Sequence, residues 1–330
     1  VTGVQTCALP ISGSEALRKA AASHASLLWE YRSPEALLAE AVPGEADFPL
    51  FTWQRELHQV MTRTSWEPGA LSVFFSCRVP GTLTHSHADL GGFDLTAYGR
   101  PLVVDPGRFC YREDEDRRLF KMSTWHNVAT VNNKDPFDFI SSWRFGPQKS
   151  AAVTRVFRSG GVTAAECEHD NYDPVRLRRL LAVIEGKFVL VLDEAVSPDP
   201  VFSVQLYYHI DSTQVRLGAD RRTAFSCDEG LPNVLIASSG ALVGELLPGK
   251  VSDDLDTARP STRLLLRDVN RTKTRRAYAT VIHPFPAGEE APAVEQLDVQ
   301  AADGAVVCSF RIGGAAYRAE WSGGGFHLGK

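Results

Sequence analysis

Hydrophobic and polar residues alternate over long stretches of this chain after residue 51. In residues 71–79, the apolar side chains of Leu71, Val73 and Phe75 continue at every second position, with mostly polar residues between them. Side chains two positions apart lie on the same face of a strand, so this pattern predicts strands with one buried face. Similar patterns or short apolar runs predict strands at residues 71–79, 93–98, 102–104, 153–157, 180–184, 188–192, 202–211, 234–237, 263–266, 277–282, 306–312 and 316–321.

A tight turn is predicted at Glu185-Gly186, because a glycine-containing pair between two apolar runs favours a β-hairpin. The predicted strands are short and regularly spaced, with little helix between them. These features predict a mostly β fold, a large antiparallel β-sandwich over residues 51–330, with a surface loop at residues 284–292.

The first 50 residues have a different pattern. Residues 15–31 are rich in alanine, and Ser33-Pro34-Glu35 is typical of a helix N-cap followed by proline at the first helical position. Short helices cannot bury their apolar faces alone, so residues 13–50 are predicted to be the remnant of a larger helical domain. Residues 1–12 lack the basic start and long apolar centre of a secretion signal. They are predicted to be a non-native leader, with the native protein beginning further upstream.

Composition narrows the class of protein. The 330 residues are 44% hydrophobic and 23% charged, as in ordinary globular proteins. No apolar run approaches the roughly 20 residues that a membrane-spanning helix needs. The net charge of −5 argues against a nucleic-acid-binding protein. The oligomeric state and the cellular compartment are not predicted by these features.

The cysteines and the arginine clusters suggest structural roles. Outside the leader the cysteines are widely spaced, odd in number and without a Cys-x-x-Cys pair, which favours buried thiols over disulfides or a thiolate zinc site; they are Cys77, Cys110, Cys167, Cys227 and Cys308. The arginine clusters either form solvated faces or bind an anionic ligand; they are Arg176, Arg178 and Arg179, and Arg271, Arg275 and Arg276.

Three histidines and two aspartates form the most informative pattern. His85 and His87 would point the same way on a strand, and Asp89 would join them if the strand continued. Asp105 in an Asp-Pro-Gly turn and His126 in a His-Asn pair could complete a site with two histidines and one carboxylate for a divalent metal. The alternative is two histidines on a polar sheet face with unrelated turn residues.

The ordered motifs between residues 55 and 135 resemble those of the heparinase II/III-like polysaccharide lyases. They are His85-Ser-His87-Ala-Asp89-Leu-Gly-Gly-Phe93, Gly99-Arg-Pro-Leu-Val-Val-Asp105-Pro-Gly107 with Tyr111, and Arg118-Leu-Phe-Lys-Met-Ser-Thr-Trp-His126-Asn127. The resemblance implies an α/α toroid followed by a β-sandwich, an anionic polysaccharide substrate in the cleft between them, and a periplasmic or secreted protein. Gly92 departs mildly from the family, which often has serine there. The toroid's catalytic tyrosine, histidine and asparagine are expected upstream of residue 1.

The same resemblance implies a role for each motif residue. A zinc ion is expected to be bound by His87, Asp105 and His126, while His85 faces the cleft. The zinc is expected to be structural, clamping three strands together. Asp89 or Asn127 would orient one of its ligands.

The reaction implied is β-elimination at a uronic acid. The C5 proton becomes removable when the neighbouring carboxylate is neutralised, and the site then needs a base and an acid. The candidates are His85 and Tyr111, and the candidates for binding acidic sugars are Arg112, Arg118 and Lys121. For His85 the alternative is an ordinary surface histidine, and for Tyr111 it is packing within the sandwich.

Two other functions fit parts of the pattern. A cupin also begins its metal motif with His-x-His on an all-β fold, but it would require a glutamate where this chain has Asp89 and then glycines. A carbohydrate-binding or structural β-sandwich without turnover is the other alternative.

Overall fold

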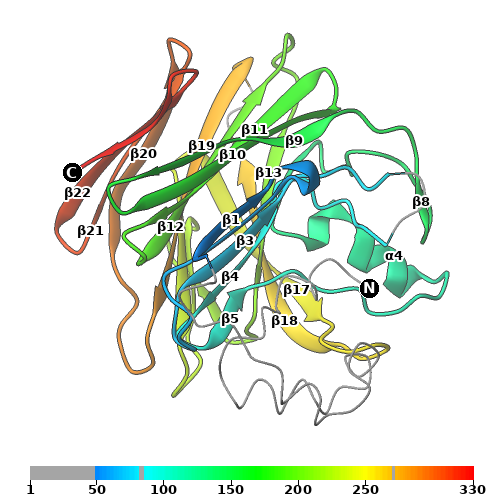
Figure 1. The fold of residues 1–330 in the computed structure, drawn as a ribbon, viewed down its shortest axis with the longest axis horizontal. Helices are drawn as coiled ribbons and strands as arrows, with labels where there is room; N and C mark the ends of the chain where they lie inside the picture. The colour runs from blue at the N-terminus through cyan, green and yellow to red at the C-terminus, as the bar shows by residue number, and fades with distance from the viewer. Residues whose placement is uncertain (1–48, 82–84, 270–271) are drawn as a thin grey trace.

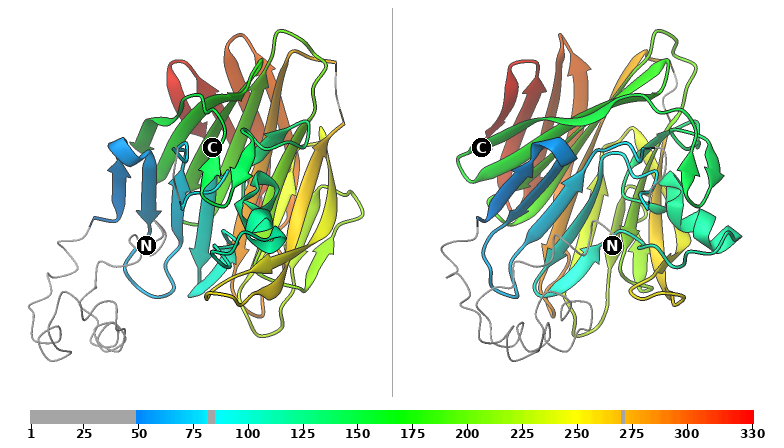
Figure 2. Two further views of the ribbon diagram at one scale, coloured as in Figure 1. Left: turned by 90° about the vertical axis from the view of Figure 1, so that its right-hand side faces the viewer. Right: turned by 45° about the vertical axis from the view of Figure 1, so that its right-hand side comes forward.

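The computed structural model describes residues 49–81, 85–269 and 272–330. These residues form a mostly β fold of antiparallel strands, arranged in three stacked sheets and one separate two-stranded hairpin (Figure 1; Figure 2). The leader predicted at residues 1–12 and nearly all of the helical remnant at 13–50 lie outside the described residues. None of the helices in the described part of the chain combines the length and the apolar character needed to cross a membrane.

The first sheet has nine strands and carries the candidate site at one end. Eight of them follow the order β1-β2-β3-β4-β5-β13-β18-β17, and β6 pairs with β13 beside β5. Their bounds are β1 (Phe51–Gln54), β2 (Gln59–Arg63), β3 (Ser72–Ser76), β4 (Gly92–Ala97), β5 (Arg100–Val103), β6 (Ala129–Val131), β13 (Val204–Ile210), β17 (Leu242–Val251) and β18 (Arg259–Asp268).

The second sheet has eight strands in the order β14-β15-β16-β19-β12-β11-β10-β9. Their bounds are β9 (Ala151–Ser159), β10 (Val162–Tyr172), β11 (Val175–Ile184), β12 (Phe188–Val196), β14 (Val215–Leu217), β15 (Thr223–Ser226), β16 (Asn233–Ser238) and β19 (Arg275–Phe285). The predicted hairpin joins β11 to β12, and Glu185 and Gly186 have φ angles of 52° and 64°. Two successive positive φ angles match the twist of a two-residue hairpin, so this prediction is confirmed.

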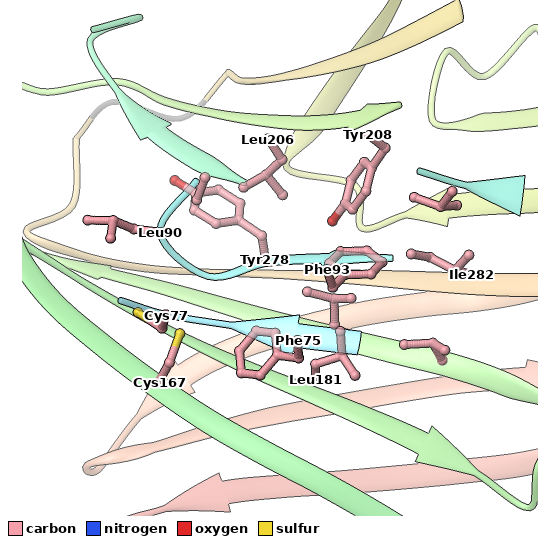
Figure 3. Packing of buried hydrophobic residues seen from close by; sticks show 14 of the residues in the cluster. Phe75, Cys77, Leu90, Phe93, Cys167, Leu181, Leu206, Tyr208, Tyr278 and Ile282 are labelled. Atoms are coloured by element: carbon pink, nitrogen blue, oxygen red, sulfur yellow. The ribbon is translucent and has the colours of Figure 1, made fainter. Parts of the chain in front are cut away.

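The main hydrophobic core lies between the first and second sheets. It includes Phe75, Phe93, Leu181 and Tyr208, whose side chains meet from both sheets (Figure 3). On β3 and β4 buried and half-buried residues alternate, as the sequence pattern predicts. The buried thiols of Cys77 and Cys167 lie side by side in this core.

A third sheet of four strands covers the outer face of the second sheet. It contains β20 (Val294–Ala302), β21 (Ala305–Ile312), β22 (Ala315–Ser322) and β23 (Gly325–Gly329). A second core forms here from both sheets and includes Leu190, Phe310 and Trp321. Because β12 lies between two cores, all but one of its residues are buried, and its first five residues, 188–192, are continuously apolar instead of alternating.

The segment between β5 and β6 contains elements that the sequence pattern does not predict. They are the short helix α4 (Glu115–Lys121) and the 3₁₀ turn η3 (Ser123–Trp125). The hairpin strands β7 (Phe139–Ser141) and β8 (Arg144–Phe145), which follow β6 in the chain, are not predicted either. The Asp114 side chain caps α4 by accepting a hydrogen bond from the Arg117 N–H at 2.8 Å. Helix α4 and β8 lie beside each other at one edge of the sandwich (Figure 1).

Most of the clustered arginines have internal ion-pair partners. The Arg179 guanidinium binds Asp193 at 2.7 Å, and Arg276 binds Asp268 at 2.7 Å, both in the interior. Arg178 and Arg275 both contact Glu194. The prediction of solvated faces is therefore wrong for these residues, which are half-buried or buried and cross-link strands of the second sheet and its surroundings. Arg271 lies outside the described residues.

The cysteine prediction is largely confirmed. All five cysteines outside the leader are free thiols, and four of them are buried, while Cys227 is half-buried.

Candidate metal centre

His87, Asp105 and His126 converge at one end of the first sheet. One possible ligand atom from each residue lies within 4.8 Å of the other two. The topology explains this convergence. The start of β4 is next to the end of β5 because the two strands are antiparallel, and β5 and β6 follow one another along β13, at Ile210 and Leu206 respectively. The loop before β4, the turn after β5 and the turn before β6 therefore meet.

The polar contacts of these three side chains leave room for a further ligand. His126 Nδ1 lies 2.7 Å from Asp105 Oδ2, and Asp105 Oδ1 accepts a hydrogen bond from the Gly107 N–H at 2.9 Å. The Nε2 atoms of His87 and His126 are buried, and neither has a hydrogen-bond partner among the described residues. An unsatisfied buried polar group costs about 1–3 kcal/mol. Two imidazole nitrogens and a carboxylate are a donor set that suits zinc, so the residues present fit this metal.

The electrostatics favour the protonation states that a metal needs at His87 and Asp105, and at His126 they favour the proton that a metal would replace. Burial and the neighbouring His126 hold the pKa of His87 well below its usual value, so its imidazole is neutral. Burial opposes ionisation of Asp105, but His126, His87 and the Gly107 N–H together outweigh it and lower the pKa of Asp105 to about 2. Burial lowers the pKa of His126, whereas the contact with Asp105 raises it, and the net shift is upward.

Two further carboxyl groups lie behind the site. Asp94 Oδ1 accepts a hydrogen bond from the Asp105 N–H at 2.5 Å, and burial beside Asp105 raises the pKa of Asp94 to about 8. Burial also raises the pKa of Asp89 to about 6. Asp94 was not selected from the sequence, where it is one polar position in an alternating strand. Its protonated form would hold the backbone of Asp105 without adding a second negative charge beside it.

Asn127 connects the strands around the site. Its Nδ2 donates to the carbonyl oxygens of Phe93 and Val104 at 2.7 and 3.0 Å, and its Oδ1 accepts from the His209 N–H at 2.6 Å. It was expected to orient a metal ligand directly. In the structure its side chain forms hydrogen bonds with backbone groups instead. These bonds fix the backbone of Asn127, and they position His126 only because His126 is the preceding residue.

Arg179 joins the second sheet to the same region. Besides binding Asp193, its Nη1 donates to the carbonyl oxygens of Gly91 and Asn127 at 2.9 and 2.7 Å. This contact could not be predicted from the sequence, because Arg179 and Gly91, in the loop before β4, are 88 residues apart.

His85 and His87 do not share one strand face, contrary to the sequence prediction. Residues 85–91 form a loop before β4. His87 is buried, with its ring centroid 5.2 Å from that of His126. His85 is exposed and packs edge-on against Tyr111 and Trp143, with centroid distances of 5.4 and 5.1 Å. The loop conformation separates the two histidines, since the alternation rule holds only in an extended strand.

Tyr111 and Trp143 form an aromatic wall beside His85. Their rings are stacked at 5.5 Å with an interplanar angle of 20°. Trp143 was not selected from the sequence, where nothing links it to the histidine motif. The β7–β8 hairpin holds it in place, because the Ser142 N–H donates to the Glu113 carboxylate and the Ser142 carbonyl accepts from Lys121 Nζ at 2.6 Å.

The three cations proposed for sugar binding have different environments. Arg112 is exposed and forms ion pairs with Asp114 and Asp256. Arg118 is exposed, 3.9 Å from a carboxylate oxygen of Glu115. Lys121 is fully buried instead of facing solvent, and burial, followed by the charge of Arg117, lowers its pKa to about 7. Of the three side chains, Lys121 is the one that hydrogen-bonds to the backbone of the hairpin that carries Trp143, whereas Arg118 lies over the ring of Phe139 in that hairpin.

Comparison with known proteins identifies the fold. No curated protein matches the chain in sequence. Among solved structures, the heparinase III from gene BT4657 superposes with a TM-score of 0.75 at 16% identity, covering 93% of this chain and 48% of its own. The heparan sulfate lyase HepC from Pedobacter heparinus gives a TM-score of 0.74 at 16% identity, covering 92% of this chain and 48% of its own.

The present chain thus spans about half the length of these lyase structures. A second type of comparison, with models of protein families, gives a match over most of the sandwich. The model described as "Heparinase II/III-like, C-terminal" matches residues 53–289. The chain therefore belongs to the heparinase II/III-like C-terminal family.

Proposed function

We propose that this chain is the C-terminal part of a polysaccharide lyase that cleaves a uronic-acid-containing polysaccharide by β-elimination. The observation that supports this proposal is the contact of Tyr111 with His85, which lies two residues along the loop from His87, and His87 converges with Asp105 and His126. The family and fold support it. The resemblance to glycosaminoglycan- and alginate-degrading enzymes supplies the substrate class.

We propose His85 as the acid/base group. Burial lowers the pKa of His85, and the charges of Arg117, Lys121 and Arg108 lower it further, so the imidazole is neutral near pH 7 and can accept a proton. The same cations favour an anionic sugar beside it. In the reaction the base takes the C5 proton, the electron pair forms the C4–C5 double bond, and the bond from C4 to the glycosidic oxygen breaks. That oxygen leaves with a proton from the acid, for which Tyr111 is the candidate on this side of the cleft.

We propose that His87, Asp105 and His126 bind a structural zinc ion. When bound, zinc would cross-link the three segments that carry these ligands. Because His87 and His85 are two residues apart, fixing the loop at His87 also fixes the direction in which His85 and its aromatic neighbours face. Asp94 and Asn127 would support the ligand backbones in this arrangement.

The test is an absorbance assay on the complete gene product. Elimination creates an unsaturated uronate that absorbs in the ultraviolet, so heparan sulfate, alginate and hyaluronan are tested separately. We expect product from at least one of them, and we expect His85→Ala to lower kcat by about 100-fold or more while the metal is retained. His327→Ala, which removes an exposed histidine of β23, is the matched control. Binding of these polysaccharides without any absorbance change would instead identify a non-catalytic carbohydrate-binding protein.

A further inference from the structure

We infer that Arg117 and Arg108 form an anion-binding pocket against Tyr111 that takes a carboxylate or sulfate-ester group of an acidic sugar. This inference rests on the proposed function and names two recognition residues that the histidine motif does not include. Both guanidinium groups lie over the Tyr111 ring, with their central carbons 5.5 Å (Arg117) and 5.2 Å (Arg108) from its centroid.

The guanidinium of Arg117 has donors without acceptors. Its side chain is fully buried, at 0% exposure, and its Nη1 donates to the Arg108 carbonyl oxygen at 2.8 Å. Its Nε and Nη2, and Nε of Arg108, are buried and have no hydrogen-bond partner within the described ranges. Three buried nitrogen donors, on two permanently charged groups beside the same tyrosine ring, match the oxygen atoms of a carboxylate or a sulfate.

Other buried arginines of this chain show what Arg117 lacks. Arg179 and Arg276 are as deeply buried, and each binds an aspartate at 2.7 Å. Arg117 has no carboxylate within 4.0 Å in the part of the chain that the structure describes. A buried cation without a counter-charge is strongly unfavourable. Arg179 and Arg276 are neutralised by their aspartates, whereas Arg117 is not. An uncompensated buried charge at one position is expected of a binding site.

The surrounding charges favour an anion. Arg108 and Lys121 both lie close enough to Arg117 for their charges to interact with it. The Glu113 carboxylate interacts electrostatically with the Arg117 guanidinium. Its oxygen atoms accept hydrogen bonds from the Ser142 N–H at 3.1 and 2.9 Å. Glu113 is therefore hydrogen-bonded to the β7–β8 hairpin, and the cations near Tyr111 outnumber this carboxylate.

The aromatic wall indicates that the anion belongs to a sugar. Tyr111 stacks on Trp143, and exposed His85 packs edge-on against both rings. Small-molecule sites typically combine aromatic side chains with a few converging polar groups. A ring-bearing ligand would contact this wall while its acidic group reaches the arginines past the half-buried side chains of Arg108 and Tyr111.

The test is calorimetric titration of the 330-residue protein with sodium glucuronate, with inorganic sulfate and with uncharged methyl glucoside. We expect binding of an anionic probe and not of methyl glucoside. Preference for glucuronate would identify a carboxylate site, and preference for sulfate would identify a sulfate-ester site. Arg117→Gln and Arg108→Gln should each weaken binding by about tenfold or more. Arg216→Gln, at an exposed arginine of β14, is the matched control and should bind as the wild type does.

The inference is overturned if the wild-type protein binds neither anion, or if the Arg117 and Arg108 variants bind as well as Arg216→Gln. Circular dichroism shows whether each variant folds. If Arg117→Gln does not fold, the wild-type titration and Arg108→Gln decide the matter. Anion binding without polysaccharide cleavage would refute the lyase proposal alone, whereas cleavage without anion binding would refute the pocket alone.

Discussion

Asp105 Oδ2 lies 2.7 Å from His126 Nδ1, although the two residues are 21 positions apart, one after β5 and the other before β6. The contact exists because β5 and β6 follow one another along the same partner strand, β13. It brings a carboxylate, held ionised, next to an imidazole whose other nitrogen is buried and unpartnered among the described residues.

Metal analysis of the purified protein is expected to find about one zinc per chain. His87→Ala and His126→Ala should each lose most of it, because each variant removes one donor from a set of three. His327→Ala, at an exposed position, should keep it. The measurement is inductively coupled plasma mass spectrometry after dialysis against chelator-treated buffer. Stoichiometric zinc in both site variants would contradict the proposed ligand set.

Gly107→Ala is expected to disturb the Asp105 turn. Gly107 has φ +82°, and an added Cβ would clash with the backbone oxygen of Ser252. Gly230→Ala is a matched control, since Gly230 has φ +70° but open space around it. Both variants incur the backbone strain of a positive φ, about 1 kcal/mol. Only Gly107→Ala should lose further stability and zinc.

Urea unfolding and zinc content measure the two effects on these variants. Equal losses of stability in Gly107→Ala and Gly230→Ala would show that the close approach to Ser252 has no energetic role. Unchanged zinc content in Gly107→Ala would show that the turn does not control the position of the Asp105 carboxylate.

His169 is expected to contribute to acid sensitivity. Burial and the nearby charge of Arg179 lower its pKa from 6.5 to about 3. A histidine with a lowered pKa in the folded state contributes stability that is fully present above pH 6.5 and is lost as the pH falls towards 3. The loss is at most about 1.4 kcal/mol per pH unit within this window.

The check is the free energy of unfolding at several pH values with a chelator present, so that metal release does not contribute. His169→Gln should flatten the acid limb of the curve, because the substituted side chain does not titrate. His327→Gln, at an exposed histidine, should leave the slope unchanged. An identical acid slope in His169→Gln and the wild type would refute the prediction.

Local signals predicted much of the first two sheets. The alternation at residues 71–79 corresponds to β3, and Glu185-Gly186 forms the predicted hairpin. Such features depend on neighbouring residues, so they can be read from one sequence. The short helix α4 was not predicted, since its seven residues carry no clear amphipathic period and its capping aspartate lies among other acidic residues.

The third sheet shows where the local pattern ends. Strands at residues 306–312 and 316–321 were predicted and correspond to β21 and β22. That they cover the second sheet was not predicted, although the apolar run at residues 188–192 of β12 is a sign of burial on both faces. The family match also replaces the cupin alternative, which the histidine spacing alone left open.

The amino-acid sequence by itself determined the strand pattern, the hairpin and, through the ordered motifs, the choice of His87, Asp105 and His126. Only the tertiary structure decided that these three side chains meet, that His85 faces the other way with Tyr111 and Trp143, and that buried Arg117 lacks the acidic partner that Arg179 has. The physical reason is that periodicity specifies which face of a strand is buried. Loop conformation and strand pairing over long sequence distances specify which side chains come into contact.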